Sequence, residues 1–395
     1  MMKKITALLL ALAMVFALCA CGNGDKDKDK DGDKAKIKVG FIFLHDENST
    51  YDLNFMNAAE AACKNLGVEY VFKKNIPEDQ KCYDAAAELA EEGCNIIFAD
   101  SFGHEPFIIE AAKEFPDVQF CHSTGTLAHT EKLSNYHNAF ASIYEGRYLA
   151  GIAAGLKLNE MIANGEFTAD EAKMGYVGAF TYAEVISGYT AFYLGAKSVC
   201  PSVTMDVKFT GSWYDLTAEK ETAEALIEGG CKIISQHADS MGAPSACERA
   251  GVPNVSYNGS TFVACPDTFI VSSRIDWAPY FKYIITQTAQ GKAIDTNWTG
   301  TLTTGSVVLT NVGSKASAEG TVEKIVEVRT KLANGEINVF DTNNFTVNGE
   351  KVTTKVIEGH EVIVNGIFKE SDFRSAPYFD LRIDGIRLLN EEYGK

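Results

Sequence analysis

Short apolar runs of strand length alternate along most of the chain with segments that carry apolar residues at helical spacing. The first strand-like run covers 39–44, and the first helical pattern follows at 53–66. The alternation continues through 68–72, 79–92, 95–99, 105–115 and 118–121, and it restarts with 174–180, 184–196, 205–209 and 215–228. Strands that alternate with helices of this length predict an α/β fold built on parallel, doubly wound sheets.

An internal repeat indicates two such sheets. A shift of 137 residues aligns Gly93–Ile97 with Gly230–Ile234, and the helical patterns before these two segments fall into register. Ala99-Asp-Ser101 then matches Ala238-Asp-Ser240 after a two-residue insertion. Two lobes joined by crossing segments leave a cleft between the carboxyl ends of their strands, where open α/β sheets bind ligands.

The repeat suggests a division of the chain. We expect residues 37–150 to form the first part of lobe 1 and residues 151–270 to form lobe 2. Residues 271–339 should hold the crossover and the remaining parts of both lobes. A helix containing Glu145–Gly155 should lead from one lobe to the other, and its Ala/Gly face should let it pack closely against a neighbour. The C-terminal extension, residues 340–395, is not placed by its pattern.

The N-terminal segment predicts export. Lys3 and Lys4 precede an apolar run, 5–18, that is too short to span a bilayer comfortably, so residues 1–20 read as a signal peptide. Leu18-Cys19-Ala20-Cys21 resembles a bacterial lipobox, which implies that Cys21 becomes the lipid-bearing N-terminus; an ordinary secretory signal is the alternative. The Asp- and Lys-rich stretch 21–36 predicts a disordered tether. We therefore expect a lipid-anchored protein on the outer face of the bacterial cytoplasmic membrane.

Composition and the absence of certain motifs exclude several classes of function. The net charge of −17 argues against nucleic acid as a partner, because such binding needs a basic surface. The chain has no Cys/His spacing typical of zinc, and the aspartates of 27–31 lack the glutamate of a calcium loop, so we expect no metal and no cofactor. Hydrolase, P-loop and dinucleotide motifs are absent, which favours a binding protein over an enzyme. The eight cysteines after Cys21 should be mostly free, buried thiols.

Polar and aromatic residues gather where the predicted strands end. Trp213 stands out in the loop 210–215, which follows one strand, and Asp239 follows another. Aromatic rings beside carboxylates and amides suit a ligand with a flat ring and hydroxyl groups. Few basic residues fall on these loops, which argues against phosphate or a free carboxylate. The candidate ligand-binding residues are Asp46, Tyr51, Asn54, Ser101, Phe102, Glu184, Trp213, Asp239, Asn258 and Trp277.

Each of these candidates, taken alone, also has a purely structural explanation. Trp213 could pack in a core, and Asp239 could cap the helix after it. Asp46 and Asn54 could shape a turn and a helix start, and Glu184 could cap a helix at the lobe boundary. The hypothesis of a binding site rests on the set rather than on any single residue.

Four segments resemble the basic membrane protein (Bmp) family, the lipid-anchored substrate-binding proteins of ABC importers. They are Glu145–Gly151, Gly178-Ala-Phe180 followed by Glu184, Gly211–Asp215 and Gln236–Ser240. The resemblance implies a type I periplasmic-binding fold with a hinge, and a purine nucleoside or nucleobase held between aromatic rings in the cleft. It makes Trp213 one aromatic wall and Asp46, Asp239 and Asn258 polar contacts. Tyr51, Phe102 and Trp277 remain open as the second wall.

The predicted function is thus delivery of a purine nucleoside or base to an ABC permease by hinge closure. A sugar or other polyol in the same fold is one alternative. A receptor that reports a ligand to a membrane sensor is another, and a nucleoside hydrolase is a third.

Overall fold

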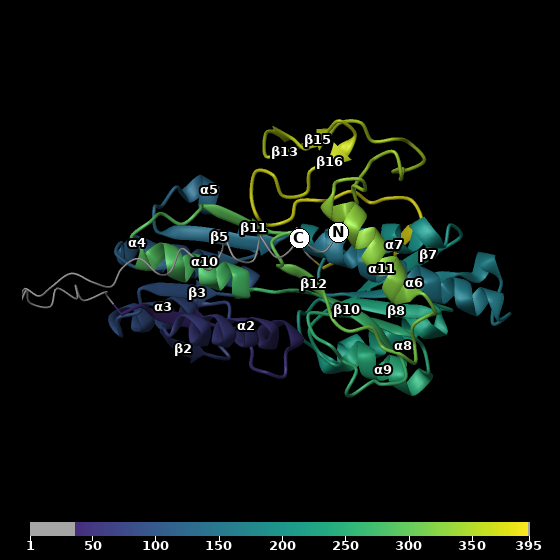
Figure 1. Cartoon of the computed structure of the whole chain (residues 1–395), viewed down its shortest axis with the longest axis horizontal. Helices are drawn as coiled ribbons and strands as arrows, with labels where there is room; N and C mark the ends of the chain where they lie inside the picture. Colours follow the sequence, from purple (N-terminus) through teal and green to yellow (C-terminus); the bar gives the residue numbers. More distant parts are fainter. Residues whose placement is uncertain (1–35, 394–395) are drawn as a thin grey trace, which may run out of the picture. The chain divides into compact units, whose positions relative to one another are not determined.

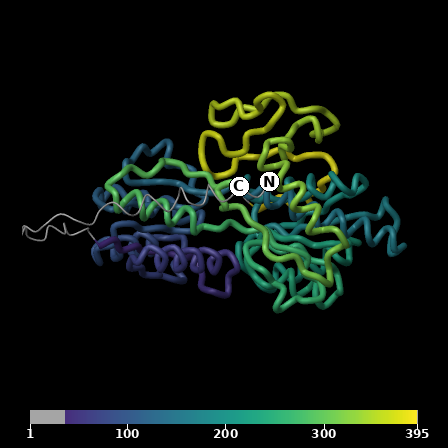
Figure 2. Tube along the Cα trace, in the orientation of Figure 1, coloured from purple at the N-terminus to yellow at the C-terminus, as the bar shows by residue number. Residues whose placement is uncertain are grey.

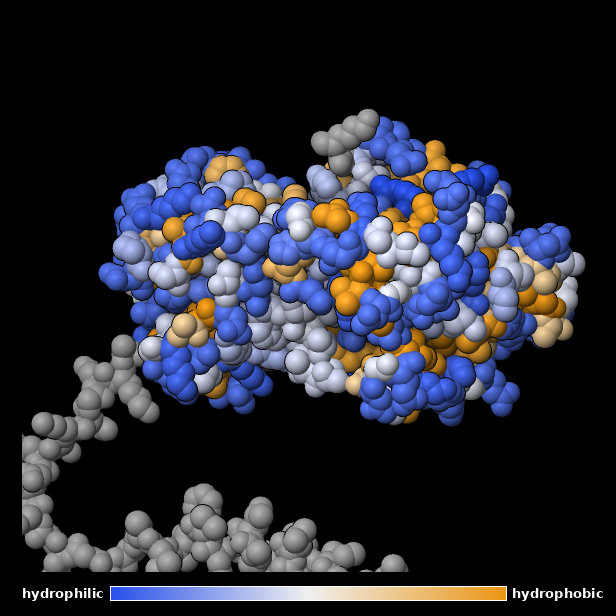
Figure 3. Space-filling model, turned by 90° about the horizontal axis from the view of Figure 1, so that it is seen from above, coloured by the Kyte–Doolittle hydropathy of each residue, from blue (hydrophilic) through white to orange (hydrophobic). Residues whose placement is uncertain are grey.

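The computed structural model describes residues 36–393. The predicted signal peptide, Cys21 and the tether up to residue 35 lie outside this range. None of the helices within residues 36–393 combines the length and the hydropathy that a membrane-spanning helix needs. Hydrophilic residues cover most of the face drawn in Figure 3, with apolar residues in smaller patches between them.

Lobe 1 is built on six parallel strands in the order β11-β5-β4-β3-β1-β2. The strands are β1 (Lys38–Ile42), β2 (Glu69–Lys73), β3 (Ile96–Ala99), β4 (Gln119–Ser123), β5 (Tyr136–Ala141) and β11 (Asn297–Gly300). The helices are α2 (Thr50–Leu66), α3 (Gln80–Glu91), η1 (Phe102–His104), α4 (Glu105–Glu114), α5 (Ala128–Glu131) and α10 (Ala278–Ala289). Alternate residues of β1 face different cores: Val39 and Phe41 pack with α2 and α10, and Ile42 packs with α3 and α4. Helices therefore cover both faces of this sheet (Figure 1).

Lobe 2 is built on seven strands in the order β12-β10-β9-β8-β6-β7-β17, parallel except between β10 and β12. The strands are β6 (Lys173–Gly178), β7 (Thr204–Phe209), β8 (Ile233–His237), β9 (Asn254–Tyr257), β10 (Phe269–Ile275), β12 (Val307–Leu309) and β17 (Ile386–Leu388). The helices are α6 (Ile143–Ala163), η2 (Ala169–Glu171), α7 (Ala183–Val199), α8 (Leu216–Glu228), α9 (Gly242–Ala250) and α11 (Thr321–Ala333). The predicted class, α/β with two doubly wound sheets, is confirmed.

The chain passes between the two sheets three times, after β5, after β10 and after β11. The tube in Figure 2 lets the reader follow these passages by colour. The first passage leads into α6, the helix expected from its Ala/Gly face. That face packs against α7 at very short range: a Cβ added to Gly151 would lie 2.0 Å from the carbonyl oxygen of Phe192, and one added to Gly195 would lie 2.0 Å from that of Tyr148. Glycine is therefore required where these two helices cross.

Several elements were not predicted, among them β5, β9 and β11, and the C-terminal extension was left unplaced. The strand β5 has polar residues at His137 and Asn138, so its apolar pattern is weak, yet it is buried between β4 and β11. The C-terminal extension is folded. It forms two small hairpins, β13 (Val356–Ile357) with β14 (His360–Glu361) and β15 (Ile363–Val364) with β16 (Ile367–Phe368), drawn in yellow-green in Figure 1, and then adds β17 to lobe 2.

Candidate functional site

A pocket of about 390 Å³, counting the space at its mouth, lies between the lobes. Most of its lining residues stand at or just after the carboxyl end of a parallel strand, and Tyr51 and Glu184 lie in the first turns of the helices that follow β1 and β6, as expected for the crevice of an α/β sheet. Its lining residues are Leu44, His45, Tyr51, Ser101, Phe102, Thr124, Glu184, Trp213, His237, Asp239 and Tyr257.

Aromatic rings from both lobes meet at this pocket. Phe102 of lobe 1 stacks on Tyr182 of lobe 2, with ring centroids 5.1 Å apart. Tyr182 in turn stacks on Phe180 at 5.2 Å, and Phe180 meets the ring of Trp213 edge-on at 5.0 Å. Trp213 is therefore held by aromatic neighbours while its side chain still lines the pocket.

A neutral histidine and a carboxylate lie side by side in the wall from lobe 2. Nε2 of His237 lies 3.3 Å from Oε1 of Glu184. Burial lowers the pKa of His237, so its imidazole is uncharged near neutral pH and offers one donor and one acceptor. The centroid of the His237 ring lies 4.6 Å from the centroid of the Tyr257 ring. The buried Arg147 guanidinium lies 3.4 Å from the same Tyr257 centroid. This stack fixes the imidazole without placing the arginine in the pocket lining.

Asp239 belongs both to the pocket and to the contact between the lobes. Its backbone carbonyl accepts hydrogen bonds from N and Oγ1 of Thr50, at 3.0 and 3.1 Å, at the start of α2 in lobe 1. Its own N–H donates to the carbonyl of Trp213 at 2.9 Å. Burial, followed by the charge of Glu219, raises the pKa of the Asp239 carboxyl well above its usual value. A ligand that donates hydrogen bonds to Asp239 would favour its charged form.

Tyr51 and Ser101 complete the wall from lobe 1. Oη of Tyr51 donates to the carbonyl of Asp100 at 2.7 Å, and Ser101 donates to Oε1 of Glu78 at 2.5 Å. Both hydroxyls are thus already engaged as donors and can accept from a ligand.

The prediction that Trp277 could form the second aromatic wall of the site is wrong. Trp277 is 1% exposed and stacks on Phe55 at 4.5 Å, inside the core of lobe 1. The second crossing ends at this residue, which begins α10, so its side chain falls under that helix rather than in the cleft.

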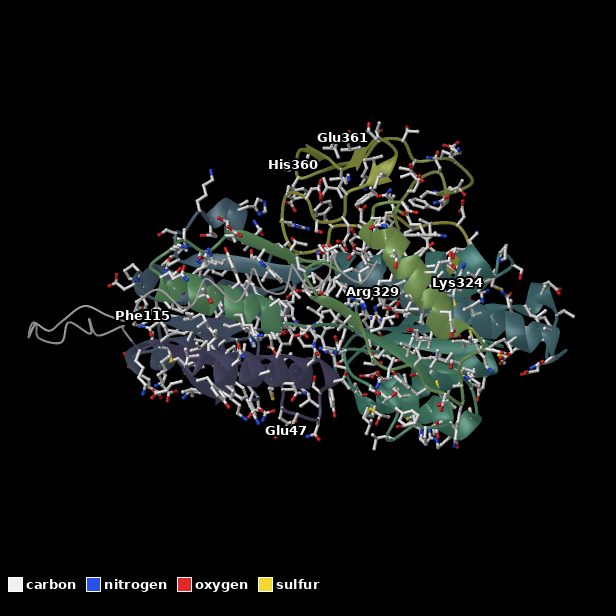
Figure 4. The ribbon with its side chains drawn as sticks, viewed as in Figure 1. Glu47, Phe115, Lys324, Arg329, His360 and Glu361 are labelled. Carbon is white, nitrogen blue, oxygen red and sulfur yellow. The ribbon has the colours of Figure 1, made fainter. Side chains whose placement is uncertain are left out.

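Three further candidates lie outside the pocket. Asp46 caps a turn by accepting from N and Nδ2 of Asn48, at 3.0 and 2.8 Å. Its exposed neighbour Glu47, labelled in Figure 4, forms an ion pair with Lys74. Asn54 donates to the carbonyl of Ile275 at 2.7 Å and lines a separate hollow together with Asn258. Asn258 reaches the pocket only through Asp239, whose Oδ1 lies 3.4 Å from its Nδ2.

The candidate set omitted five lining residues: Leu44, His45, Thr124, His237 and Tyr257. All five stand at or just after the ends of strands β1, β4, β8 and β9. The first three of these strands were predicted, so the carboxyl-end rule could have found Leu44, His45, Thr124 and His237. Thr124 carries a further signal only in the structure, a left-handed backbone with φ of 61°.

The C-terminal extension borders the same site. A second hollow shares Phe102, Thr124 and Glu184 with the pocket and is walled by Arg374, Ala376 and Pro377. The extension is tied to both lobes: Oγ of Ser187 donates to Oε1 of Glu370 at 2.5 Å, and the N–H of Ser375 donates to Oδ1 of Asn297 at 3.2 Å.

The charged groups of the pocket lining are acidic, apart from its histidines. Its lining within residues 36–393 contains no lysine or arginine. The described part of the chain holds no group of three His, Cys, Asp or Glu side chains suited to a metal ion. The eight cysteines of this part are free and buried, as predicted.

Two α/β lobes with a pocket between them define a solute-binding protein of the type I periplasmic-binding fold. A solute-binding protein of an ABC transporter from Aeropyrum pernix K1 has this fold, with a TM-score of 0.65 at 17% identity over 80% of this chain and 94% of that one. The model of the Bmp family, described as ABC transporter substrate-binding protein PnrA-like, matches residues 43–343. The chain therefore belongs to this family of extracytoplasmic substrate-binding proteins, as its motifs predicted.

Two relatives carry more specific names. A purine-binding protein of Brucella abortus (strain 2308) is 30% identical over 346 residues, which cover 83% of this chain and 92% of that protein. A protein of Haloferax volcanii assigned as an ABC transporter glucose-binding protein is 30% identical over 259 residues, 65% of this chain and 62% of that protein.

Proposed function

We propose that the interlobe pocket binds a purine nucleoside or nucleobase, which the protein hands to its ABC permease. The observation that carries the proposal is Trp213, held in the pocket beside Glu184, His237 and Asp239 with no lysine or arginine in the lining. A purine stacks on an indole, and base stacking contributes about 1–3 kcal/mol. The name of the Brucella relative supports the same ligand.

In this proposal each polar group of the pocket forms hydrogen bonds with a part of the ligand. Glu184 and Asp239 accept hydrogen bonds from ring N–H groups or ribose hydroxyls, and charge-assisted bonds of this kind are the stronger ones. The uncharged His237 provides a donor or an acceptor. Phe102 reaches over from lobe 1 and serves as the second aromatic wall.

Delivery would follow from hinge motion about the three crossings. The hydrogen bonds between Thr50 and Asp239 and the stack of Phe102 on Tyr182 join the lobes and must break when they separate. A ligand that touches both lobes favours the closed form by its better binding to that form. The permease then recognises the closed protein.

A sugar is the second candidate, favoured by the assignment of the Haloferax relative. Sugars also stack on aromatic rings and donate hydroxyls to carboxylates, so the pocket chemistry alone does not separate the two. A thermal-shift screen with adenosine, inosine, hypoxanthine, ribose and glucose does. At about 100 times its dissociation constant a true ligand adds about 2.7 kcal/mol to the free energy of unfolding.

Stabilisation by a purine compound but not by ribose or glucose is the expected result. Stabilisation by glucose alone would replace the proposal with the sugar alternative. Adenosine incubated with the protein should be recovered intact, since release of free adenine would make the protein a hydrolase.

We also propose that Cys21 anchors the mature chain by a lipid. Cys21→Ala should move the protein from the membrane fraction to the soluble fraction of the producing bacterium. Cys19→Ala is the matched control and should leave the protein in the membrane fraction.

A further inference from the structure

The last described residues of the chain lie beyond residue 343, where the family match ends, and they return to lobe 2 beside the pocket. The strand β17 pairs in parallel with β7, and the N–H of Leu389 donates to the carbonyl of Val207 at 2.8 Å. Asn390 then bonds the last residue of β7 twice: its Oδ1 accepts from N of Phe209 at 2.8 Å, and its Nδ2 donates to the Phe209 carbonyl at 3.0 Å. The chain end thus follows β7 up to its carboxyl end, where the Trp213 loop begins.

Tyr393 touches both loops that carry the aromatic residues of lobe 2. Its backbone carbonyl accepts the N–H of Thr181 at 3.0 Å, and Thr181 directly precedes Tyr182. Its ring lies against Gly211, two residues before Trp213. A Cβ built on Gly211 would stand 2.6 Å from Cδ1 and Cε1 of that ring, so only glycine admits the contact.

Gly211 meets a second requirement at the same point. Its φ is 75°, in the left-handed region that favours glycine. The loop has internal hydrogen bonds, such as Ser212 Oγ to the Tyr214 carbonyl at 3.1 Å, and bonds to its neighbours, from the N–H of Gly211 to the Ala179 carbonyl and from the N–H of Asp239 to the Trp213 carbonyl, both at 2.9 Å. Tyr393 adds a contact from a distant segment to these bonds, and segments with fewer such contacts open more easily.

We propose that Tyr393 is a positioning residue for the ligand site, holding the Tyr182 and Trp213 loops in register through one carbonyl and one ring. Tyr393 does not line the pocket. It acts by restricting two loops that must otherwise be ordered when the ligand binds, and ordering at the moment of binding weakens affinity. The consequence for affinity rests on the proposed function, whereas the restriction of the loops does not.

Hydrogen–deuterium exchange on the ligand-free protein tests the restriction directly. Tyr393→Ala should raise exchange at least severalfold in peptides covering 179–183 and 210–215. Tyr393→Phe keeps the ring and the carbonyl and should exchange like the wild type. Arg387→Ala is a control on the same strand: it removes two bonds to Asp206, at 2.8 and 2.7 Å, nearer the other end of β7, and should leave both peptides unchanged. Equal exchange in Tyr393→Ala and wild type would overturn the proposal.

Calorimetry with adenosine tests the consequence. Tyr393→Ala should raise the dissociation constant about tenfold, and Tyr393→Phe and Arg387→Ala should leave it within about twofold. If Tyr393→Ala leaves the dissociation constant unchanged, the positioning role is overturned, and the residue serves only to complete the edge of the sheet. If adenosine does not bind the wild type, the proposed ligand fails, and the exchange measurement alone decides the role of Tyr393.

Discussion

Phe102 of lobe 1 and Tyr182 of lobe 2 stack with their ring planes 28° apart, at the edge of the pocket that both lobes line. Because the two rings belong to different lobes, separation of the lobes would remove this contact. Phe102 is 37% exposed even in the contact, so its packing depends on Tyr182. The pair therefore links pocket chemistry to domain closure.

We predict that the stack contributes to closure. Phe102→Ala and Tyr182→Ala should each weaken binding of adenosine, and the double variant should lose less than the sum. The coupling should be about 0.5–1.5 kcal/mol, the usual value for an aromatic pair. Phe262→Ala, an exposed aromatic of lobe 2, is the control; additive losses in the double variant would show that the rings act independently.

Trp213 should matter to binding and Trp277 to stability. Trp213→Ala removes the stacking surface and should raise the dissociation constant for adenosine about tenfold to hundredfold. Trp277→Phe leaves space in the core of lobe 1 and should lower the melting temperature with no change in affinity. Titration calorimetry and thermal unfolding of both variants check this, and the reverse pattern would contradict the placement of the two rings.

Glu370 should make the protein less stable as the pH rises. Burial raises its pKa from 4.5 to about 8. Between these values the folded protein keeps a proton that the unfolded chain releases, so the free energy of unfolding falls with pH, by at most about 1.4 kcal/mol per pH unit. Glu370→Gln should remove this part of the slope in urea unfolding at pH 5–8.

The matched control for Glu370 is Glu361→Gln in the same extension, on the exposed strand β14 (Figure 4). It should leave the slope unchanged. A Glu370→Gln variant with the slope of the wild type would mean that this carboxyl keeps its charge in the fold.

The crossing of α6 and α7 should not tolerate a methyl group. Gly195→Ala places a Cβ 2.0 Å from the Tyr148 carbonyl oxygen, and such overpacking costs about 1–3 kcal/mol. Gly259→Ala, whose Cβ would have its nearest neighbour at 3.8 Å, is the control. Denaturant unfolding of the two variants should separate them, and equal stabilities would refute the close contact.

The cysteines should be hidden rather than paired. Burial raises the pKa of Cys63 and Cys121 to about 12, which leaves almost no reactive thiolate at neutral pH. Ellman's reagent should therefore react slowly with the folded protein and should find the eight thiols of residues 36–393 in guanidinium. Fewer than eight would indicate disulfides.

The sequence by itself determined the class of fold and much of the site. Alternating periods of apolar residues specify strands and helices whatever surrounds them, and the carboxyl-end rule then placed Tyr51, Ser101, Phe102, Glu184, Trp213 and Asp239 in the pocket lining. Motifs around Glu145 and Trp213 were enough to indicate the family. These features depend on residues that are close together in the sequence, so they can be predicted from the sequence alone.

Only the tertiary structure decided which aromatic residues face the cleft and what the C-terminal extension does. Trp277 and Trp213 both follow strands, but α10 folds back over Trp277 and buries it, an outcome set by helix packing rather than by neighbours in sequence. Tyr393 reaches Thr181 and Gly211 across about two hundred residues because β17 pairs with β7. No periodicity encodes such a contact, since it depends on where two distant segments meet in space.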